Sequence, residues 1–480
     1  MFWDRDRLAA GDLPPVVIVG SGPAGVSLAL RLAGQGVGSV VLEAGGEAYS
    51  PASQDFYRGR VIGDPYHALD AARLRYFGGT SNHWTGYCRT LDAEDFEARA
   101  DIPHSGWPIA RADIAPYAEG AAEILEIDAN VDRPLEGSVF VATRQASPAV
   151  RFGEKYAGFF RTSEIAHLCL ETAVGAIRAE EGRITALDLR APDGTAFEIR
   201  PRAVVLCTGG IENSRLLLWS NRTSPRKVVA EDRALGRYWM EHPEFALGEI
   251  RLDRPLFGPP RGTERLTVAA KHAAIRRHGV MNGLMHFQDV PRGWNGGAKA
   301  IARELACAAP ALGEMVYTAT DRTLECHQRV IAEWEQAPVA ENRVALSETE
   351  RDAHGVPRPE LHWRKTERDY RTARVLMELL GRHAVRQGLG RVRVHDFVIE
   401  ERLQPDNGWY SAYHHMGGTR MAATPREGVV DRDLRIFGLS NGYVLGSSVF
   451  ATGGYANPTQ TIVMLALRLG DHLGQKVGTL

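Results

Sequence analysis

The chain has 480 residues, more than one hydrophobic core usually supports, so we expect two structural units. Its 57 lysines and arginines nearly balance its 59 aspartates and glutamates, which argues against nucleic acids and acidic membranes as partners. With 44% apolar and 24% charged residues, the composition is that of a globular protein whose default partner is a small molecule.

The N-terminal segment and the cysteines indicate the cellular compartment in which the protein is expected. Residues 1–15 mix charges with few apolar residues and lack the apolar core of a signal peptide. No apolar run reaches the length of a membrane span. The five cysteines are scattered and form no CxxC pair, so neither a disulfide framework nor a zinc site is indicated. We therefore expect a cytoplasmic protein with no membrane contact.

Residues 16–45 form one compact pattern of strand, glycine turn, helix and strand. The runs 16–19 and 40–42 are entirely apolar, and helix-forming residues occupy 24–32 between them. All-apolar strands are typical of a parallel sheet that is covered on both faces. A similar run at 203–206, followed by a helix-like stretch from Glu212, is expected to join the same sheet.

The glycine turn, GSGPAG, predicts a dinucleotide site. Gly20 permits the tight turn, Gly22 lets the backbone approach a pyrophosphate, and Gly25 lets the helix pack on the sheet. Glu43 ends the next strand, where a carboxylate binds ribose hydroxyls and repels a 2′-phosphate. The motif argues against NADP and leaves FAD and NAD open.

Residues 78–86 read GGTSNHWTG, in which the glycines indicate backbone pressed against something flat or bulky. From chemistry alone, His83 is either a hydrogen-bonded structural histidine or a cofactor contact. Beyond residue 243, the stretches PEFALGEIRL, QRVIAEWEQ and ELHW alternate in polarity, which favours an antiparallel sheet with one face on a core.

Two helices are predicted in the last third of the chain. Residues 364–385 carry Val375, Leu376, Leu379 and Leu380 at helical spacing, with their charges on a solvated face. The chain is rich in glycine from about residue 405, and residues 461–474 form a plausible closing helix that returns to the first unit.

These motifs together resemble the glucose-methanol-choline (GMC) oxidoreductase family, and within it the branch around pyranose oxidase. The resemblance rests on GSGPAG with Glu43, GGTSNHWTG, CTGGIENSRLLL, LGRYWMEHP and GGYANPTQT, whereas residues 255–330 carry no family signature. It implies FAD as the cofactor, with Thr85 near flavin N5. It also implies that His83 can be bonded to the flavin, and leaves a bonded and an unbonded flavin both open.

The motif YHHMGGT at 413–419 and Asn457 in GGYANPTQT are the candidate catalytic segments. Adjacent histidines in an extended segment point to opposite faces and cannot both bind one ion, so we expect no metal. Histidine suits the base that removes the hydroxyl proton of an alcohol. The resemblance implies His415 for that role and Asn457 as its partner on the alcohol oxygen, with His414 facing away or supporting.

We therefore expect an α/β fold with a discontinuous Rossmann-like FAD-binding domain and a smaller substrate domain that has a mainly antiparallel sheet. The first comprises residues 1–110, 160–242 and 405–480, and the second comprises residues 111–159 and 243–404. The candidate cofactor contacts are Gly20, Gly22, Gly25, Glu43, Thr80, Asn82, His83, Thr85, Val174, Gly446, Ser447 and Thr459.

The resemblance implies oxidation of a secondary alcohol of a sugar, glycoside or aminocyclitol-like substrate to a ketone, by hydride transfer to flavin N5. Oxygen or another acceptor then reoxidises the flavin. Oxidation of a primary alcohol to an aldehyde and a flavin-containing lyase on the same fold are the alternatives. A non-catalytic FAD-binding subunit is disfavoured because it has no need of His415 and Asn457.

Overall fold

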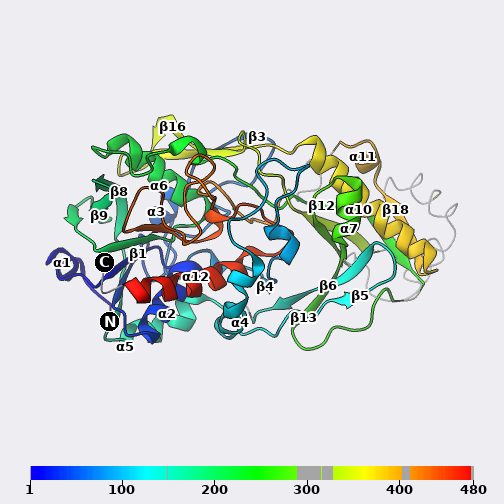
Figure 1. Ribbon diagram of the computed structural model, residues 1–480, viewed down its shortest axis with the longest axis horizontal. Helices are drawn as coiled ribbons and strands as arrows, with labels where there is room; N and C mark the ends of the chain where they lie inside the picture. The colour runs from blue at the N-terminus through cyan, green and yellow to red at the C-terminus, as the bar shows by residue number, and fades with distance from the viewer. Residues whose placement is uncertain are drawn as a thin grey trace.

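The structure is a computed structural model that describes residues 2–148, 150–253, 255–288, 315, 328–402 and 411–476. The molecule is elongated, and its two ends are built around different sheets (Figure 1). Both termini lie at the end that holds β1, α2 and α12 (Figure 1). The strands β12 and β18 and the long helix α10 make up the opposite end.

A five-stranded parallel sheet forms the core of the first end, in the order β19, β11, β1, β2, β7. Its strands are buried along their whole length, as expected for a parallel sheet covered on both faces. The predicted strand at 203–206 is β11 and lies directly beside β1. The bounds are β1 (Val16–Val19), β2 (Ser39–Leu42), β7 (Ala166–Cys169), β11 (Ala203–Leu206) and β19 (Gly442–Val444).

Helices from distant parts of the chain cover this sheet. The closing helix α12 (Pro458–Lys476) packs along α2 (Pro23–Gly34), and Arg31 Nε lies 2.6 Å from Asp471 Oδ1 between them. The C-terminal segment therefore returns to the first sheet, as the sequence predicts. Two further helices at this end are α5 (Phe152–Thr162) and α6 (Gly209–Thr223).

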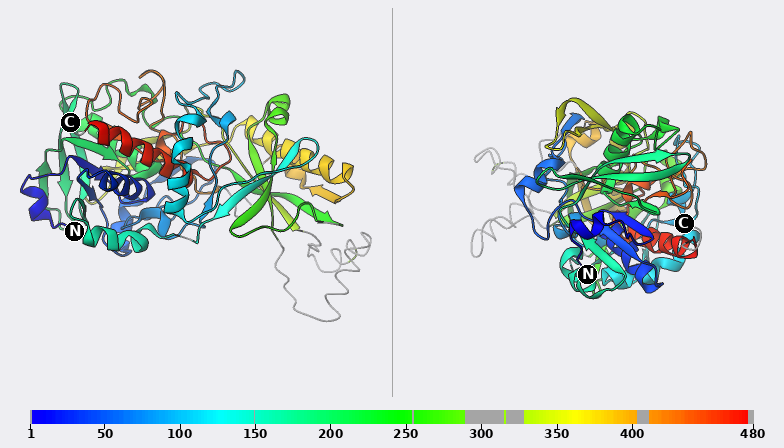
Figure 2. Two further views of the ribbon diagram at one scale, coloured as in Figure 1. Left: turned by 60° about the horizontal axis from the view of Figure 1, so that its bottom comes forward. Right: turned by 90° about the vertical axis from the view of Figure 1, so that its left-hand side faces the viewer.

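An antiparallel sheet forms the second end, in the order β18, β12, β15, β14, β13, β6, β4, with β5 paired to β6. Helix α10 (Glu367–Arg386) covers one face and buries the four predicted apolar residues (Figure 2). The bounds are β4 (Tyr87–Cys88), β5 (Arg133–Pro134), β6 (Val139–Ala146), β12 (Glu244–Leu252), β13 (Glu264–Ala270), β14 (Gly283–Gln288), β15 (Gln328–Trp334) and β18 (Gly390–Val394).

Two three-stranded sheets complete the described fold. One comprises β8 (Ala173–Glu180), β9 (Arg183–Arg190) and β10 (Ala196–Ile199), and the other comprises β3 (Arg60–Gly63), β16 (Arg343–Arg351) and β17 (Pro357–Trp363). The stretch ELHW thus alternates as expected but pairs with β3 rather than with the large sheet. The short helices are α1 (Arg5–Ala9), α3 (Pro51–Gln54), α4 (Ala118–Leu125), α7 (His272–His278) and α11 (Asp396–Ile399).

The structure bears on the cysteines, on the stretch without a family signature and on membrane spans. Cys88, Cys169 and Cys207 are free and buried, whereas Cys307 and Cys326 lie outside the described residues. Much of the stretch 255–330, which carries no family signature, also lies outside them. No helix within the described ranges is both long enough and apolar enough to cross a membrane.

Candidate active site

A cavity of about 590 Å³ begins at the carboxyl ends of β1 and β2. The chain order reverses at β1, since β2 and β11 lie on its two sides, and such a switch point is where open α/β sheets bind ligands. The cavity continues to the segments that carry the two histidines and Asn457. Its lining includes Gly20, Gly22, Glu43, Thr80, His83, Thr85, Val174, His414, His415, Gly446, Ser447, Asn457 and Thr459.

The three glycines of the turn meet different surroundings. Gly20 has φ +104°, and a Cβ there would lie 2.6 Å from the carbonyl oxygen of Cys207. A Cβ on Gly25 would lie 2.0 Å from the carbonyl oxygen of Gly20, which explains the close packing of α2 on the sheet. A Cβ on Gly22 would meet no atom within 4 Å. Gly22 thus borders open space at the N-terminus of α2, where an anion is favoured.

Glu43 is held rigidly at the wall of the cavity. It is 6% exposed, and its Oε2 accepts hydrogen bonds from the backbone nitrogen (3.1 Å) and hydroxyl (2.6 Å) of Ser21. Its Oε1 accepts one from the backbone nitrogen of Gly45 at 2.8 Å. Each carboxylate oxygen offers about two acceptor directions, so the group retains capacity for ribose hydroxyls. The residues at this wall therefore fit a dinucleotide.

The segment 78–86 borders the middle of the cavity. Gly78 has φ +92°, and a Cβ there would lie 2.4 Å from the backbone nitrogen of Gly153. Partial burial, and then the charge of Arg151, lower the pKa of His83, which favours a neutral imidazole. Asn82 differs from its neighbours, because its Nδ2 donates to the carbonyl oxygen of Phe77 at 2.8 Å and it is not among the cavity-lining residues.

The two adjacent histidines both line the cavity but have different hydrogen-bond partners. The Nε2 atom of His414 lies 3.2 Å from Nδ2 of Asn457. The Nε2 atom of His415 instead lies 3.0 Å from the hydroxyl oxygen of Tyr66. The hydrogen-bonding partner of Asn457 is therefore His414, and the expectation that His414 faces away is corrected.

His415 also lines the cavity, and its ring lies among aromatic side chains. Its ring centroid is 5.6 Å from that of Trp239 and 6.2 Å from that of Tyr66. Burial lowers its pKa to about 3, with further contributions from the charges of Arg73 and His414. An imidazole with so low a pKa is a weak proton acceptor near neutral pH. The surroundings of His415 are those of a hydrogen-bonded core histidine.

The loop that carries His414 is fixed against the loop that carries His242. Met240 and Met416 exchange two backbone hydrogen bonds, of 2.8 and 3.0 Å. The Oε1 atom of Glu241 accepts from the backbone nitrogens of His242 (2.9 Å) and His414 (2.6 Å). Burial raises the pKa of Glu241 to about 7. These contacts fix the position of the His414 backbone and bring its ring to His242.

Two residues that the sequence analysis did not select complete the group. Nδ1 of His414 lies 2.8 Å from Nδ1 of His242 and 3.3 Å from Oε1 of Glu333. His242 belongs to the LGRYWMEHP stretch, which was noted only as a motif. Glu333 lies on β15, where a glutamate in a largely buried strand was the available signal.

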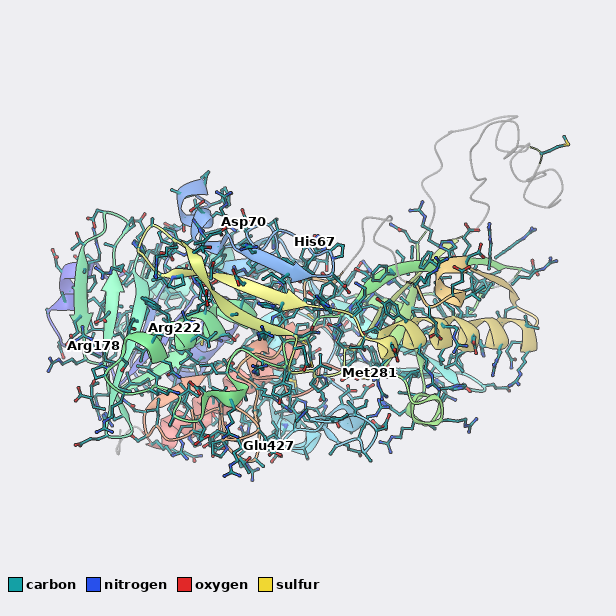
Figure 3. All side chains as sticks on the ribbon, turned by 90° about the horizontal axis from the view of Figure 1, so that it is seen from above. His67, Asp70, Arg178, Arg222, Met281 and Glu427 are labelled. Atoms are coloured by element: carbon teal, nitrogen blue, oxygen red, sulfur yellow. The ribbon has the colours of Figure 1, made fainter. Side chains whose placement is uncertain are left out.

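A different pair of residues lies at the rim of the cavity. Tyr413 is 47% exposed, has φ +60° and lines the cavity. Its ring stacks on that of His67 with a centroid distance of 4.2 Å. Figure 3 shows His67 near the middle of the long axis, between the two ends of the molecule. The cavity therefore meets solvent where the two ends of the molecule join.

The parallel sheet with its glycine turn, and the histidine–asparagine pair along the same cavity, define a dinucleotide-binding oxidoreductase. A family model described as GMC oxidoreductase matches residues 338–466, and one described as an FAD-binding domain matches residues 14–62. The chain thus carries a GMC oxidoreductase C-terminal domain and an FAD-binding domain, and its cofactor is FAD. It is an enzyme that acts on alcohols or sugars.

The chain resembles characterised enzymes along most of its length. It is 24% identical to the 2-methyl-1,2-propanediol dehydrogenase of Mycolicibacterium austroafricanum, over 97% of this chain and 96% of that protein. It is 32% identical to the C-glycoside 3-oxidase of Arthrobacter globiformis, over 28% of this chain and 25% of that protein. Among solved structures, pyridoxine 4-oxidase from Mesorbium loti has the same fold, with a TM-score of 0.58, 18% identity and coverage of 96% of this chain and 99% of that one.

Proposed function

We propose that this enzyme oxidises a secondary alcohol of a sugar, glycoside or aminocyclitol-like molecule to a ketone, with His414 as the base and Asn457 as its partner. The observation that carries the proposal is the 3.2 Å contact between His414 Nε2 and Asn457 Nδ2 along a cavity that begins at the dinucleotide turn. An imidazole nitrogen and an amide held together in this way match the two needs of an alcohol oxygen, a proton acceptor and a hydrogen-bond donor.

Different residues are assigned to cofactor binding and to proton removal. Gly22 and the start of α2 would hold the pyrophosphate of FAD, and Glu43 would hold its adenosine ribose. FAD, when bound, supplies the acceptor for the hydride that leaves the carbinol carbon. His414 Nε2 accepts the hydroxyl proton, and the Asn457 amide donates to the same oxygen as negative charge develops on it.

The choice of His414 over His415 follows from their surroundings. His414 has a side chain that is 14% exposed and an Nε2 atom directed at Asn457. The ring of His415 is directed at Tyr66, and burial lowers its pKa to about 3. Both histidines line the cavity, but only His414 lies against the amide of Asn457, which can donate a hydrogen bond to the alcohol oxygen.

The relatives support a polyol substrate and define the alternative. The C-glycoside 3-oxidases, by their name, act on a glycoside at position 3, which favours a secondary carbinol. The 2-methyl-1,2-propanediol dehydrogenase matches far more of the chain. The carbinol carbon of 2-methyl-1,2-propanediol that bears hydrogen is the primary one, so this relative favours the alternative, oxidation of a primary alcohol to an aldehyde.

Anaerobic mixing with position-labelled sugars tests the proposal. Glucose, a C-glycoside and 2-methyl-1,2-propanediol are mixed with the holoenzyme, and bleaching of the flavin is followed at its visible bands. For a sugar that reduces the flavin, deuterium on a ring carbinol carbon is expected to slow bleaching, and deuterium on the C6 methylene is not.

The reverse isotope effect supports primary-alcohol oxidation instead. A flavin that no alcohol bleaches, in a protein that releases cyanide from a cyanohydrin, supports the lyase.

A further inference from the structure

We propose that Glu333 and His242 are positioning residues for the base: they hold the hydrogen of His414 on Nδ1, so that Nε2 keeps the lone pair that accepts the alcohol proton. The inference rests on the proposed function, because it assigns a purpose to groups behind the proposed base. Neither residue touches the substrate in this account. Both act through the ring of His414.

The three groups form a closed triangle of polar atoms. Nδ1 of His414 is 2.8 Å from Nδ1 of His242 and 3.3 Å from Oε1 of Glu333. Nδ1 of His242 is 3.2 Å from the same carboxylate oxygen. Two imidazole nitrogens at 2.8 Å are joined by a hydrogen that one of them donates. A hydrogen on Nδ1 of His414 can be shared between two acceptors, the lone pair on Nδ1 of His242 and the carboxylate oxygen of Glu333.

The contact on the opposite edge of the His414 ring indicates the same tautomer. Its Nε2 atom lies 3.2 Å from the Asn457 amide nitrogen, which donates and does not accept. A donor at that distance requires a lone pair on Nε2. The contacts on the two edges of the ring therefore agree on one tautomer, with hydrogen on Nδ1 and a lone pair on Nε2.

Burial strengthens the electrostatic effect of Glu333. His242 has no exposed surface, and the side chain of Glu333 is 3% exposed. The second oxygen of the carboxylate, Oε2, lies 3.2 Å from Nη1 of Arg144 on β6. A carboxylate fixed in this way among buried groups interacts more strongly with a nearby imidazolium than it would in water.

The charge balance supports the same assignment. Burial alone would raise the pKa of Glu333, but hydrogen bonds from His242 and His414 and the charges of His414 and Arg144 hold it well below its ordinary value. Burial lowers the pKa of His414, and Glu333 partly offsets that effect. Glu333 is thus ionised, and it favours the protonated form of the ring beside it.

The proton transfer balances without any further group. The hydroxyl proton of the alcohol moves to Nε2 of His414, whose Nδ1 keeps its hydrogen, and the ring becomes an imidazolium. Glu333 supplies the opposite charge at 3.3 Å. The hydride leaves the carbinol carbon with its electron pair for FAD, and the substrate becomes a neutral ketone.

The pH dependence of this step reflects all the titratable groups packed around the triangle. Besides the three members, these groups come from the His242 loop, from the residue that follows β15, from β6 and from β12. They are Glu241, Glu335, Arg144 and Glu244. Glu244 lies directly opposite Glu333 in the pairing of β12 with β15 and is not hydrogen-bonded to His414, which makes it a matched control.

The test compares Glu333→Gln with Glu244→Gln in the holoenzyme, by the rate of anaerobic flavin reduction at saturating alcohol across pH. Glu333→Gln keeps the shape of the side chain and removes the negative charge of its carboxylate. We expect reduction to slow at least about 10-fold, since loss of an orienting carboxylate behind a histidine base costs up to about 10⁴-fold in a protease triad. Without Glu333 the pKa of His414 falls, so the acid limb of the profile moves to lower pH.

Glu244→Gln is expected to keep the wild-type rate and acid limb below about pH 7, where a neutral amide replaces a neutral carboxyl. Burial raises the pKa of Glu244 to about 8, so its carboxyl is already neutral near pH 7. A Glu333→Gln enzyme with the rate and pH profile of the wild type overturns the inference. If the wild type itself is not reduced by any alcohol, the proposed function fails instead, so the two failures are distinguishable.

A second substitution covers the case in which Glu333→Gln does not fold. His242→Asn retains an amide near the former Nδ1 and leaves Glu333 in place. It is expected to slow flavin reduction with a smaller displacement of the acid limb, because the carboxylate charge of Glu333 is retained. An unchanged rate in this folded, FAD-loaded variant contradicts the role of His242.

Discussion

Two glycine substitutions in the dinucleotide turn have opposite expected effects on the protein and on its cofactor. In Gly25→Ala the new methyl would lie 2.0 Å from the backbone oxygen of Gly20, so α2 must move away from β1 by about 1 Å. Such overpacking costs about 1–3 kcal/mol. At roughly 2–4 °C per kcal/mol for a large domain, the apoprotein should melt several degrees lower.

Gly22→Ala should leave the apoprotein intact. Gly22 has φ −72°, which any residue adopts, and its new methyl meets no atom within 4 Å. The substitution even restricts the unfolded chain, a gain of about 0.4–1 kcal/mol. The methyl does, however, enter the space assigned to the pyrophosphate. We therefore expect an unchanged or slightly higher Tm of the apoprotein together with weaker FAD binding.

Thermal unfolding of the apoproteins and titration with FAD, followed by flavin fluorescence, measure both effects. Gly25→Ala should lower the Tm, and Gly22→Ala should raise the Kd for FAD without lowering the Tm. An apoprotein of Gly22→Ala that binds FAD as tightly as the wild type would refute the placement of the pyrophosphate at Gly22. A Gly25→Ala protein with the wild-type Tm would refute the packing argument.

Three further predictions follow from other parts of the molecule. A covalent flavin at His83 predicts that acid-precipitated wild type stays yellow and carries the mass of FAD, whereas His83→Ala precipitates colourless; a colourless wild type contradicts the bond. In the wild type the buried guanidinium of Arg215 lies 2.6 Å from the carboxylate of Asp352, and Asp352→Ala leaves it with Glu212 as its remaining acid. The loss of about 3 kcal/mol in the free energy of unfolding should appear as a clearly lower Tm, and an unchanged Tm contradicts this prediction. Burial raises the pKa of Glu241 from 4.5 to about 7, so the folded state favours the protonated carboxyl and loses that stabilisation as pH rises through this window. Glu241→Gln should therefore flatten the fall of Tm between about pH 5 and pH 8. An equally steep fall in the variant contradicts the raised pKa.

The parallel sheet was predictable because its determinants are local. Four apolar residues followed by GSGPAG specify a buried strand and a tight turn without reference to distant residues. Periodicity likewise identified α10, and only the partner of ELHW was missed. The pairing of β17 with β3 joins segments about 300 residues apart, and alternation within one strand carries no information about such a partner.

The proposed catalytic pair was only partly predictable for the same reason. Alternation in YHHMGGT predicts different partners for His414 and His415, but it does not indicate which of them contacts Asn457. That choice is made by the backbone bonds between Met240 and Met416, which no local pattern encodes. The role of Glu333 is not predictable from the sequence because its partners, His242 and His414, come from two loops distant in sequence.

The central claim is that His414, and not His415, removes the proton of the alcohol. The most direct measurement is the rate of anaerobic flavin reduction in His414→Ala and His415→Ala, each loaded with FAD and assayed well below its Tm. A general base contributes about 10²–10⁴-fold, so His414→Ala should be at least about 100-fold slower, and His415→Ala should stay within about 10-fold of the wild type. A slow His415→Ala beside a fast His414→Ala would contradict the account.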